Sequence, residues 1–182
     1  MIEGLVNSDV NIAEFFAHSQ MSPFLDKVMI FITSLGDTGI FWIVCGVILL
    51  IFKKTRTSGV ALLFSLSIAF LLSQFVLKEL VSRPRPFEAI EGIELLIGIP
   101  HGSSFPSSHA TTSFASAMSL FCFNKIYGTV ALVLAALIAF SRVYLCVHFL
   151  SDVIFGAILG ITLGFILTRM LFFKKDSEVS SK

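Results

Sequence analysis

Charge is scarce in this sequence, and its scarcity excludes several classes of protein. Only 14% of the 182 residues are charged, and the formal net charge is +1. A nucleic-acid-binding domain would present a basic surface, so we expect no nucleic-acid partner. A soluble domain of this length would also need many more charged side chains to stay in solution.

Cysteine is also rare, and no pattern for redox or nucleotide chemistry is present. Cys45, Cys122 and Cys146 lie in apolar segments and form no C-x-x-C pair, so we interpret them as small packing residues. The sequence has no Gly-rich nucleotide loop, and few carboxylates are available to hold Mg²⁺. The first residues lack a basic region followed by a long apolar stretch, so we expect no cleaved signal peptide.

Hydrophobic residues dominate instead. They make up 55% of the sequence, and the mean hydropathy is +0.91. These values are typical of an integral membrane protein, whose spanning helices need about 20 apolar residues each. We predict an all-α membrane bundle of six transmembrane helices, in a single domain over residues 1–182. The six apolar segments are residues 23–35, 39–52, 58–80, 110–123, 127–144 and 149–173.

The first 20 residues are too polar to cross a membrane. Their apolar side chains alternate with polar ones such as Asp9 and Glu14, which favours an amphipathic helix lying in the membrane interface. We therefore expect an interfacial helix over residues 1–20, a transmembrane core over 21–173 and a polar cytoplasmic tail over 174–182.

The basic residues predict the orientation of the chain. Six alternating crossings would place most of them on one side, which should be the cytoplasm. These residues are Lys27, Lys53, Lys54, Arg56, Lys125, Arg169, Lys174, Lys175 and Lys182. Both termini would then be cytoplasmic. The turn over residues 36–38, which would join the first two segments as a hairpin, the loop over 81–108 and the junction over 145–148 would face the outside. The cations left outside, Lys78, Arg83, Arg85 and Arg142, need another explanation.

A first polar cluster lies at the outer end of the third apolar segment, where residues 78–87 read K-E-L-V-S-R-P-R-P-F. Two prolines restrict the backbone around Arg85, whose guanidinium can bind two phosphate oxygens at once. Spacing alone does not separate Arg85 from Arg83. Lys78 by itself could be a helix-end lysine that reaches for the interface.

A second cluster opens the fourth apolar segment, where residues 101–110 read H-G-S-S-F-P-S-S-H-A. Ser107 or Ser108 can cap the helix that follows, and the free N–H groups of its first turn can bind an anion. Capping alone would account for the serines. It does not account for His109, which can carry a proton to a leaving group.

A third cluster separates the last two apolar segments, where residues 141–152 read S-R-V-Y-L-C-V-H-F-L-S-D. In a helix His148 and Asp152 would share a face, so the carboxylate could hold one imidazole nitrogen. Such a pair can be purely structural. However, each ionisable side chain at bilayer depth costs about 2.5–3.5 kcal/mol, which favours a functional role for this cluster and for Arg142 within it.

Together the clusters indicate a phosphate-binding site that works without a metal. Cations, helix N–H groups and a hydroxyl can stabilise the equatorial oxygens of a transferring phosphoryl group. Two histidines remain for the nucleophile and for the acid that protonates the leaving oxygen. We assign the attack to His148, because only His148 has a carboxylate four residues away.

The spacing of these residues resembles that of the type 2 phosphatidic acid phosphatase superfamily. Its three motifs read K-x6-R-P, P-S-G-H and S-R-x5-H-x3-D. In this chain they lie at residues 78–86, 106–109 and 141–152. The first motif selects Arg85 over Arg83. Ser108 stands where the family has glycine, a residue that permits closer approach of the backbone.

The resemblance implies a mechanism. His148 would attack phosphorus to give a phosphohistidine, with Asp152 supporting the imidazolium. His109 would protonate the leaving group and then activate the water that releases phosphate. No cofactor or metal would take part. The pentacoordinate state would be stabilised by Lys78, Arg85, Ser107, Arg142 and the backbone N–H of Ser108.

A site at the outer membrane boundary suits a lipid whose tails stay in the bilayer. The small size of the chain resembles bacterial members that act on undecaprenyl pyrophosphate, and we expect that substrate. Phosphatidylglycerophosphate or phosphatidic acid is the alternative. The apolar residues 93–99 of the outer loop would either guide lipid head groups or anchor the loop. No oligomeric state is predicted.

The sequence is also compatible with other functions. Vanadium haloperoxidases belong to the same superfamily, but those relatives look soluble and this chain is hydrophobic. A zinc hydrolase would use His101, His109, His148 and Asp152 as ligands. A transporter or lipid-binding protein would line its path across the membrane with charges, whereas here the charges gather at one face.

Overall fold

The computed structural model describes residues 2–18 and 22–173, and this part of the chain contains helices and loops but no strand. The all-α prediction is therefore confirmed. The polar tail predicted for residues 174–182 lies outside the described residues. The helices are α1 (Ile2–His18), α2 (Pro23–Ser34), η1 (Asp37–Gly39), α3 (Ile40–Ile51), α4 (Arg56–Leu71), η2 (Leu72–Leu77), α5 (Lys78–Val81), α6 (Pro86–Ala89), α7 (Ser108–Phe123), α8 (Lys125–Tyr144), α9 (Leu150–Thr168) and η3 (Arg169–Phe173).

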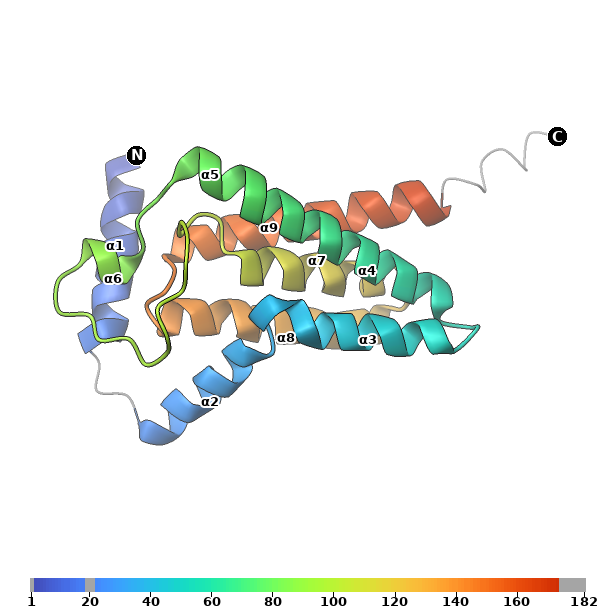
Figure 1. Ribbon diagram of the computed structural model, residues 1–182, viewed down its shortest axis with the longest axis horizontal. Coiled ribbons are helices and arrows are strands. Elements are labelled where there is room, and N and C mark those ends of the chain that lie inside the picture. The colour runs from blue at the N-terminus through green and yellow to red at the C-terminus, as the bar shows by residue number, and fades with distance from the viewer. Residues whose placement is uncertain (1, 19–21, 174–182) are drawn as a thin grey trace.

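Helix α7 is the centre of the bundle, with α4, α8 and α9 packed around it (Figure 1). Small buried residues such as Ala110, Ala115 and Ala117 let these neighbours approach closely. The polar side chains of α7 remain satisfied, because Thr112 and Ser116 donate to carbonyls four residues earlier, at 2.8 and 2.9 Å. A rather polar helix can therefore occupy the middle of an apolar bundle.

Glycines bring α9 against α7. Gly156, Gly160 and Gly164 recur at every fourth position on the face of α9 that meets α7. At Gly160 a Cβ would lie 2.4 Å from the carbonyl oxygen of Thr111, which is closer than atoms can pack. The contact therefore requires glycine.

Three helical stretches are long and apolar enough to cross a membrane, namely Arg56–Ala89, Lys125–Tyr144 and Leu150–Phe172. The bent pair of α2 and η1–α3 passes the same test, which makes up to four spans in residues 2–18 and 22–173. Helix α7 has 16 residues and is short for a hydrocarbon core of about 30 Å. The prediction of six spans is therefore not confirmed.

The first two apolar segments do not form the expected hairpin. Their helices, Pro23–Ser34 and Asp37–Ile51, meet at a bend of 46°. At the bend Thr38 and Gly39 have positive φ angles of 52° and 70°. Helix α3 therefore continues the course of α2 instead of returning beside it. Helices α1 and η3 lie at opposite ends of the bundle (Figure 1). The side of the membrane on which each terminus lies stays a prediction.

Helix α1 packs on the corner where α8 turns into α9. Its Asp9 and Ala13 are buried, and the ring of Phe16 lies 5.9 Å from that of Phe140 and 5.7 Å from that of Tyr144. A helix exists where the sequence predicted one, and one of its faces belongs to the bundle. Its position in a membrane interface stays a prediction.

The outer loop segment over residues 93–99 has two faces. Leu95 and Ile97 pack against the buried cluster that contains Tyr144 and Val147. Leu96, between them, is largely exposed. The packed face supports the interpretation of this segment as a loop anchor.

Replacing Gly160 with alanine tests the contact between α7 and α9. The added Cβ would meet backbone at 2.4 Å, so we expect a destabilisation of about 1–3 kcal/mol. Thermal denaturation of the detergent-solubilised protein measures this loss. Gly98→Ala is the matched control, because a Cβ at that position would meet nothing within 4 Å. Equal melting temperatures for the two variants would contradict the tight contact.

Candidate active site

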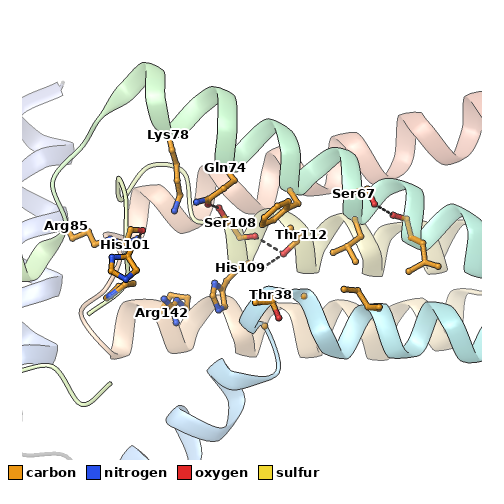
Figure 2. Close-up of a pocket in the computed structure, with 17 residues that line it drawn as sticks. Thr38, Ser67, Gln74, Lys78, Arg85, His101, Ser108, His109, Thr112 and Arg142 are labelled. Atoms are coloured by element: carbon orange, nitrogen blue, oxygen red, sulfur yellow. Dashed lines mark hydrogen bonds between the residues drawn. The ribbon is translucent and has the colours of Figure 1, made fainter. Parts of the chain in front are cut away.

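The three polar clusters of the sequence come together at one end of the bundle. Lys78 lies where η2 passes into α5, Arg85 precedes α6, His109 is in the first turn of α7, and Arg142 is in the last turn of α8. All four line one cavity, shown in Figure 2. The cavity has a volume of about 460 Å³, which is in the range of small-molecule sites.

A local change of helix type places Lys78. Residues Leu72–Leu77 form the π-helix η2, in which hydrogen bonds span five residues instead of four. The wider turn rotates the following residues relative to α4. Lys78 is consequently only 6% exposed, and its amine points into the cavity (Figure 2). It is not a helix-end lysine that reaches for the interface.

Arg85 ties two loops of the site together. Its guanidinium donates to the carbonyls of Gly102 at 2.9 Å, Val147 at 2.8 Å and His101 at 3.2 Å. These bonds hold the loop before α7 against the turn that carries His148. One guanidinium nitrogen also lies 3.4 Å from His148 Nε2, so Arg85 stands between this imidazole and the cavity.

Arg142 carries a donor without a partner. One of its terminal nitrogens donates to Thr33 Oγ1 at 2.7 Å, and the residue is 3% exposed. Its buried Nε has no acceptor anywhere in residues 2–18 and 22–173. Leaving a buried donor unpaired costs about 1–3 kcal/mol. A cost of this size favours a functional role for Arg142 over a packing role.

The cavity cations form no ion pair with a carboxylate of the described residues. In the part of the chain that the structure describes, no ion pair includes Lys78, Arg85 or Arg142. Buried like charges repel one another strongly, because little water screens them. An anion in the cavity would relieve this repulsion. The excess positive charge therefore indicates a site for phosphate or a similar oxyanion.

His148 lies in the turn between α8 and α9 and is 2% exposed. Burial lowers the pKa of His148 well below its ordinary value of 6.5, and the charges of Arg142, Arg85 and Lys78 lower it further. The imidazole is consequently neutral at neutral pH, which is the state that a nucleophile needs.

Asp152 reaches His148 through a hydroxyl. The carboxylate Oδ2 lies 3.7 Å from His148 Nδ1, which is longer than a hydrogen bond. Ser104 Oγ lies 3.4 Å from the same imidazole nitrogen and donates to Asp152 Oδ2 at 2.5 Å. The other carboxylate oxygen accepts from Arg83 at 2.5 Å. The expected pair is therefore close in space, with Ser104 bridging it.

His109 has a carboxylate partner as well. Its Nε2 lies 2.9 Å from Oδ1 of Asp37, which belongs to η1. Asp37 is 72 residues from His109 in the sequence, so short-range spacing gave a carboxylate partner to His148 alone. What distinguishes the two histidines is their position relative to Arg85.

The two serines ahead of α7 differ. Ser107 Oγ accepts from the backbone N–H of Ala110 at 3.5 Å, so this buried side chain caps the helix and does not line the cavity. Ser108 lines the cavity and donates to Gln74 Oε1 at 3.2 Å. Ser108, and not Ser107, therefore presents its side chain to the cavity.

Several contacts of the site were not expected from the sequence. The sequence held one indication of Asp37, because its turn was predicted to lie on the same side of the membrane as the polar clusters. Ser104 and Asp9 carried none, because their contacts to Asp152 and Arg83 join distant parts of the chain.

The zinc interpretation lacks a ligand set. Within residues 2–18 and 22–173, no three His, Cys, Asp or Glu side chains gather closely enough to hold a metal ion. Two of the proposed ligands are bonded to other partners, His109 to Asp37 and Asp152 to Ser104.

The geometry defines a class of protein. Apolar spans place the molecule in a membrane, the cavity cations suit a phosphorylated ligand, and a neutral imidazole lies beside them. A membrane phosphatase has these three properties.

Comparison with known proteins gives the family. Residues 58–176 match the sequence model of the PAP2 superfamily. The chain is 32% identical over 162 residues to an undecaprenyl-diphosphatase of Sulfolobus acidocaldarius, covering 88% of this chain and 77% of that protein. The chain belongs to the PAP2 superfamily, and it is a lipid phosphatase.

Solved structures agree with this membership. A transmembrane PAP2-type phosphatidylglycerolphosphate phosphatase from Bacillus subtilis superimposes with a TM-score of 0.77 at 27% identity, covering 95% of this chain and 89% of that one. LpxE of Aquifex aeolicus superimposes with a TM-score of 0.76 at 28% identity, covering 87% and 93%.

Arg142→Met should lower the phosphatase activity without lowering the stability of the protein. We expect kcat/KM to fall by about 100–1,000-fold, because an oxyanion contact is lost. The melting temperature should not fall, because the variant removes a buried charge that has no counter-ion. Phosphate-release assays and thermal denaturation measure the two effects. Arg56→Met, which changes an exposed arginine outside the cavity, should retain full activity. A less stable but fully active Arg142→Met protein would contradict the assignment.

Proposed function

We propose that this chain hydrolyses undecaprenyl pyrophosphate to undecaprenyl phosphate without a metal, through a phosphohistidine formed on His148. The observation that carries the proposal is the cavity lined by Lys78, Arg85 and Arg142, none of which forms an ion pair within residues 2–18 and 22–173. Similarity to an undecaprenyl-diphosphatase supports the choice of substrate.

The terminal phosphate binds first. Lys78, Arg85 and Arg142, which all line the cavity, surround it. Arg85 lies 3.4 Å from His148 Nε2, so a phosphate that bonds to this guanidinium is brought next to the nucleophile. The same cations then stabilise the charge on the equatorial oxygens during transfer.

His148 attacks next. A bond forms between Nε2 and phosphorus while the bond from phosphorus to the leaving oxygen breaks. The Nδ1 proton stays on the imidazole and points to Ser104 Oγ, at 3.4 Å, whose own proton goes to Asp152 at 2.5 Å. This chain of two hydrogen bonds connects the positive charge of the phosphohistidine to a carboxylate.

His109 serves both half-reactions. It protonates the departing oxygen of the lipid and then takes a proton from the water that attacks the phosphohistidine. The bond to Asp37, at 2.9 Å, orients the ring and favours its protonated form, against burial and the charge of Arg142, which lower the pKa of His109 to about 4. Release of inorganic phosphate returns both histidines to their starting states.

The far part of the cavity suits a lipid tail. Beyond the cations its walls are apolar side chains of α3 and α4, among them Ile43, Leu63, Leu66 and Phe70. A charged end and an apolar end in one cavity match an amphiphile, which distinguishes a lipid phosphate from a water-soluble ester.

The site faces outward in the proposed orientation. The turns and helix ends away from the site carry basic residues and would be cytoplasmic. These residues are Lys53, Lys54, Arg56, Lys125 and Arg169. With the bend at η1, α1 lies at the outer end together with the site.

Phosphatidylglycerophosphate is the second candidate substrate. The superposition on the phosphatidylglycerolphosphate phosphatase of Bacillus subtilis favours it. The same cations and histidines would process its monoester, so the choice between the two depends on the leaving group and tail.

A panel of lipids tests the reaction. Wild-type protein in excess chelator should release phosphate from undecaprenyl pyrophosphate, and His148→Ala should be slower by at least about 1,000-fold. Acid-labile, base-stable labelled phosphate should appear on the wild type alone. Release from phosphatidic acid or phosphatidylglycerophosphate but not from the polyprenyl lipid would overturn the substrate. Full activity of His148→Ala would overturn the mechanism.

Ser67→Trp should block the tail site. Ser67 lies on the apolar wall of the cavity and is exposed there, so an indole would take the space of the tail without disturbing packing. We expect KM for the lipid to rise about 10-fold, while the rate on a small aryl phosphate stays unchanged. Thr162→Trp, on the exposed face of α9, is the control. An equal effect on both substrates would contradict a tail site between α3 and α4.

A further inference from the structure

A buried polar network joins α1 to the carboxylate behind the nucleophile. Arg83 is its centre. One guanidinium nitrogen donates to Asp152 Oδ1 at 2.5 Å, and the other donates to Asp9 Oδ2 at 2.8 Å. The guanidinium also stacks on the ring of Phe149, with its carbon 4.2 Å from the ring centroid. None of these contacts takes part in the mechanism described above.

Asp9 is fixed by a second residue. Its Oδ1 accepts from the backbone N–H of Ser151 at 3.0 Å, and its Oδ2 accepts from the Ser151 hydroxyl. Arg83 also donates to that hydroxyl, at 2.8 Å. Ser151 lies in the first turn of α9, directly before Asp152. Asp9 therefore satisfies a free N–H at the start of the helix that carries the supporting carboxylate.

The charges of this network matter for the reaction. An ion pair of Arg83 with Asp152 alone would be neutral, and it would leave no net negative charge for the phosphohistidine. The second carboxylate, Asp9, brings the total to −1. Asp9 and Asp152 are both buried, so water screens these charges little. The network therefore keeps a net negative charge next to the His148 imidazolium only when Asp9 is present.

We infer that Asp9 and Arg83 are positioning residues of the phosphatase reaction, and that α1 is a working part of the active site. Arg83 sets the position of the Asp152 carboxylate, and Asp9 offsets the charge of Arg83. The inference rests on the proposed phosphohistidine mechanism, in which His148 gains a positive charge. Neither residue lines the cavity, and the proposed mechanism gives neither a contact with the phosphate.

Asp9→Asn tests the inference in the full-length protein. It keeps an oxygen acceptor but removes the charge, so Arg83 then neutralises Asp152. We expect kcat and the rate of phosphohistidine formation to fall 10- to 100-fold, with KM for the lipid unchanged. Glu14→Gln is the matched control, because it removes an exposed carboxylate from the same helix and should behave as wild type.

The double variant Asp9→Asn/Arg83→Gln separates charge from structure. It leaves Asp152 as the only charge of the network, so the total returns to −1. The inference predicts that kcat recovers at least severalfold over that of Asp9→Asn. A purely structural role predicts a further loss of kcat, together with a lower melting temperature, and that result would overturn the inference.

The outcomes also separate this inference from the proposed function. If the wild type hydrolyses the lipid without a trapped phosphohistidine, the proposed mechanism fails whatever the variants do. If a phosphohistidine is trapped on the wild type and Asp9→Asn has the same kcat as Glu14→Gln, only the inference about Asp9 and Arg83 fails. Size-exclusion profiles and melting temperatures show whether each variant is folded, and a variant that is unfolded is replaced by Asp9→Ser in the same comparison.

Discussion

Buried positive charge without a counter-ion is the constraint on which this end of the molecule depends. Lys78, Arg85 and Arg142 line one cavity, and no carboxylate of residues 2–18 or 22–173 forms an ion pair with them. The protein holds them with neutral groups, backbone carbonyls for Arg85 and a threonine hydroxyl for Arg142. Neutral acceptors fix a guanidinium without cancelling its charge. The attraction for a phosphate is therefore kept until the substrate arrives.

The carboxylates of the site are placed one layer further out. Asp37 and Asp152 contact histidines or their bridging hydroxyl, and Asp9 contacts Arg83. Acidic groups in this arrangement orient the bases, and cations are left for the oxyanion. The packing of small residues on α7 and glycines on α9 makes the arrangement possible, because it brings the ends of several helices within reach of one cavity.

Sequence reasoning was most successful where a contact is local. Each of the three polar clusters lies within one short stretch, so its spacing already indicates which side chains share a helix turn or a cap. The choice between Ser107 and Ser108 could not be made in this way, because both positions can cap and only the packing of α7 decides which hydroxyl is buried. The turn between the first two apolar segments was predicted to reverse the chain, and it bends the chain instead. Composition reports that a segment is apolar, but it does not report whether the chain bends by 46° or reverses.

The sequence by itself determined that the chain is a helical membrane protein, and it determined which cations and histidines lie next to the helix ends. Hydropathy and short-range spacing are properties of neighbouring residues, and neighbours are read directly. The tertiary structure alone decided that Asp37 holds His109, that Ser104 bridges His148 and Asp152, and that Asp9 of α1 reaches Arg83. Those partners come from different helices and loops, and their contacts exist only because close helix packing brings distant parts of the chain together.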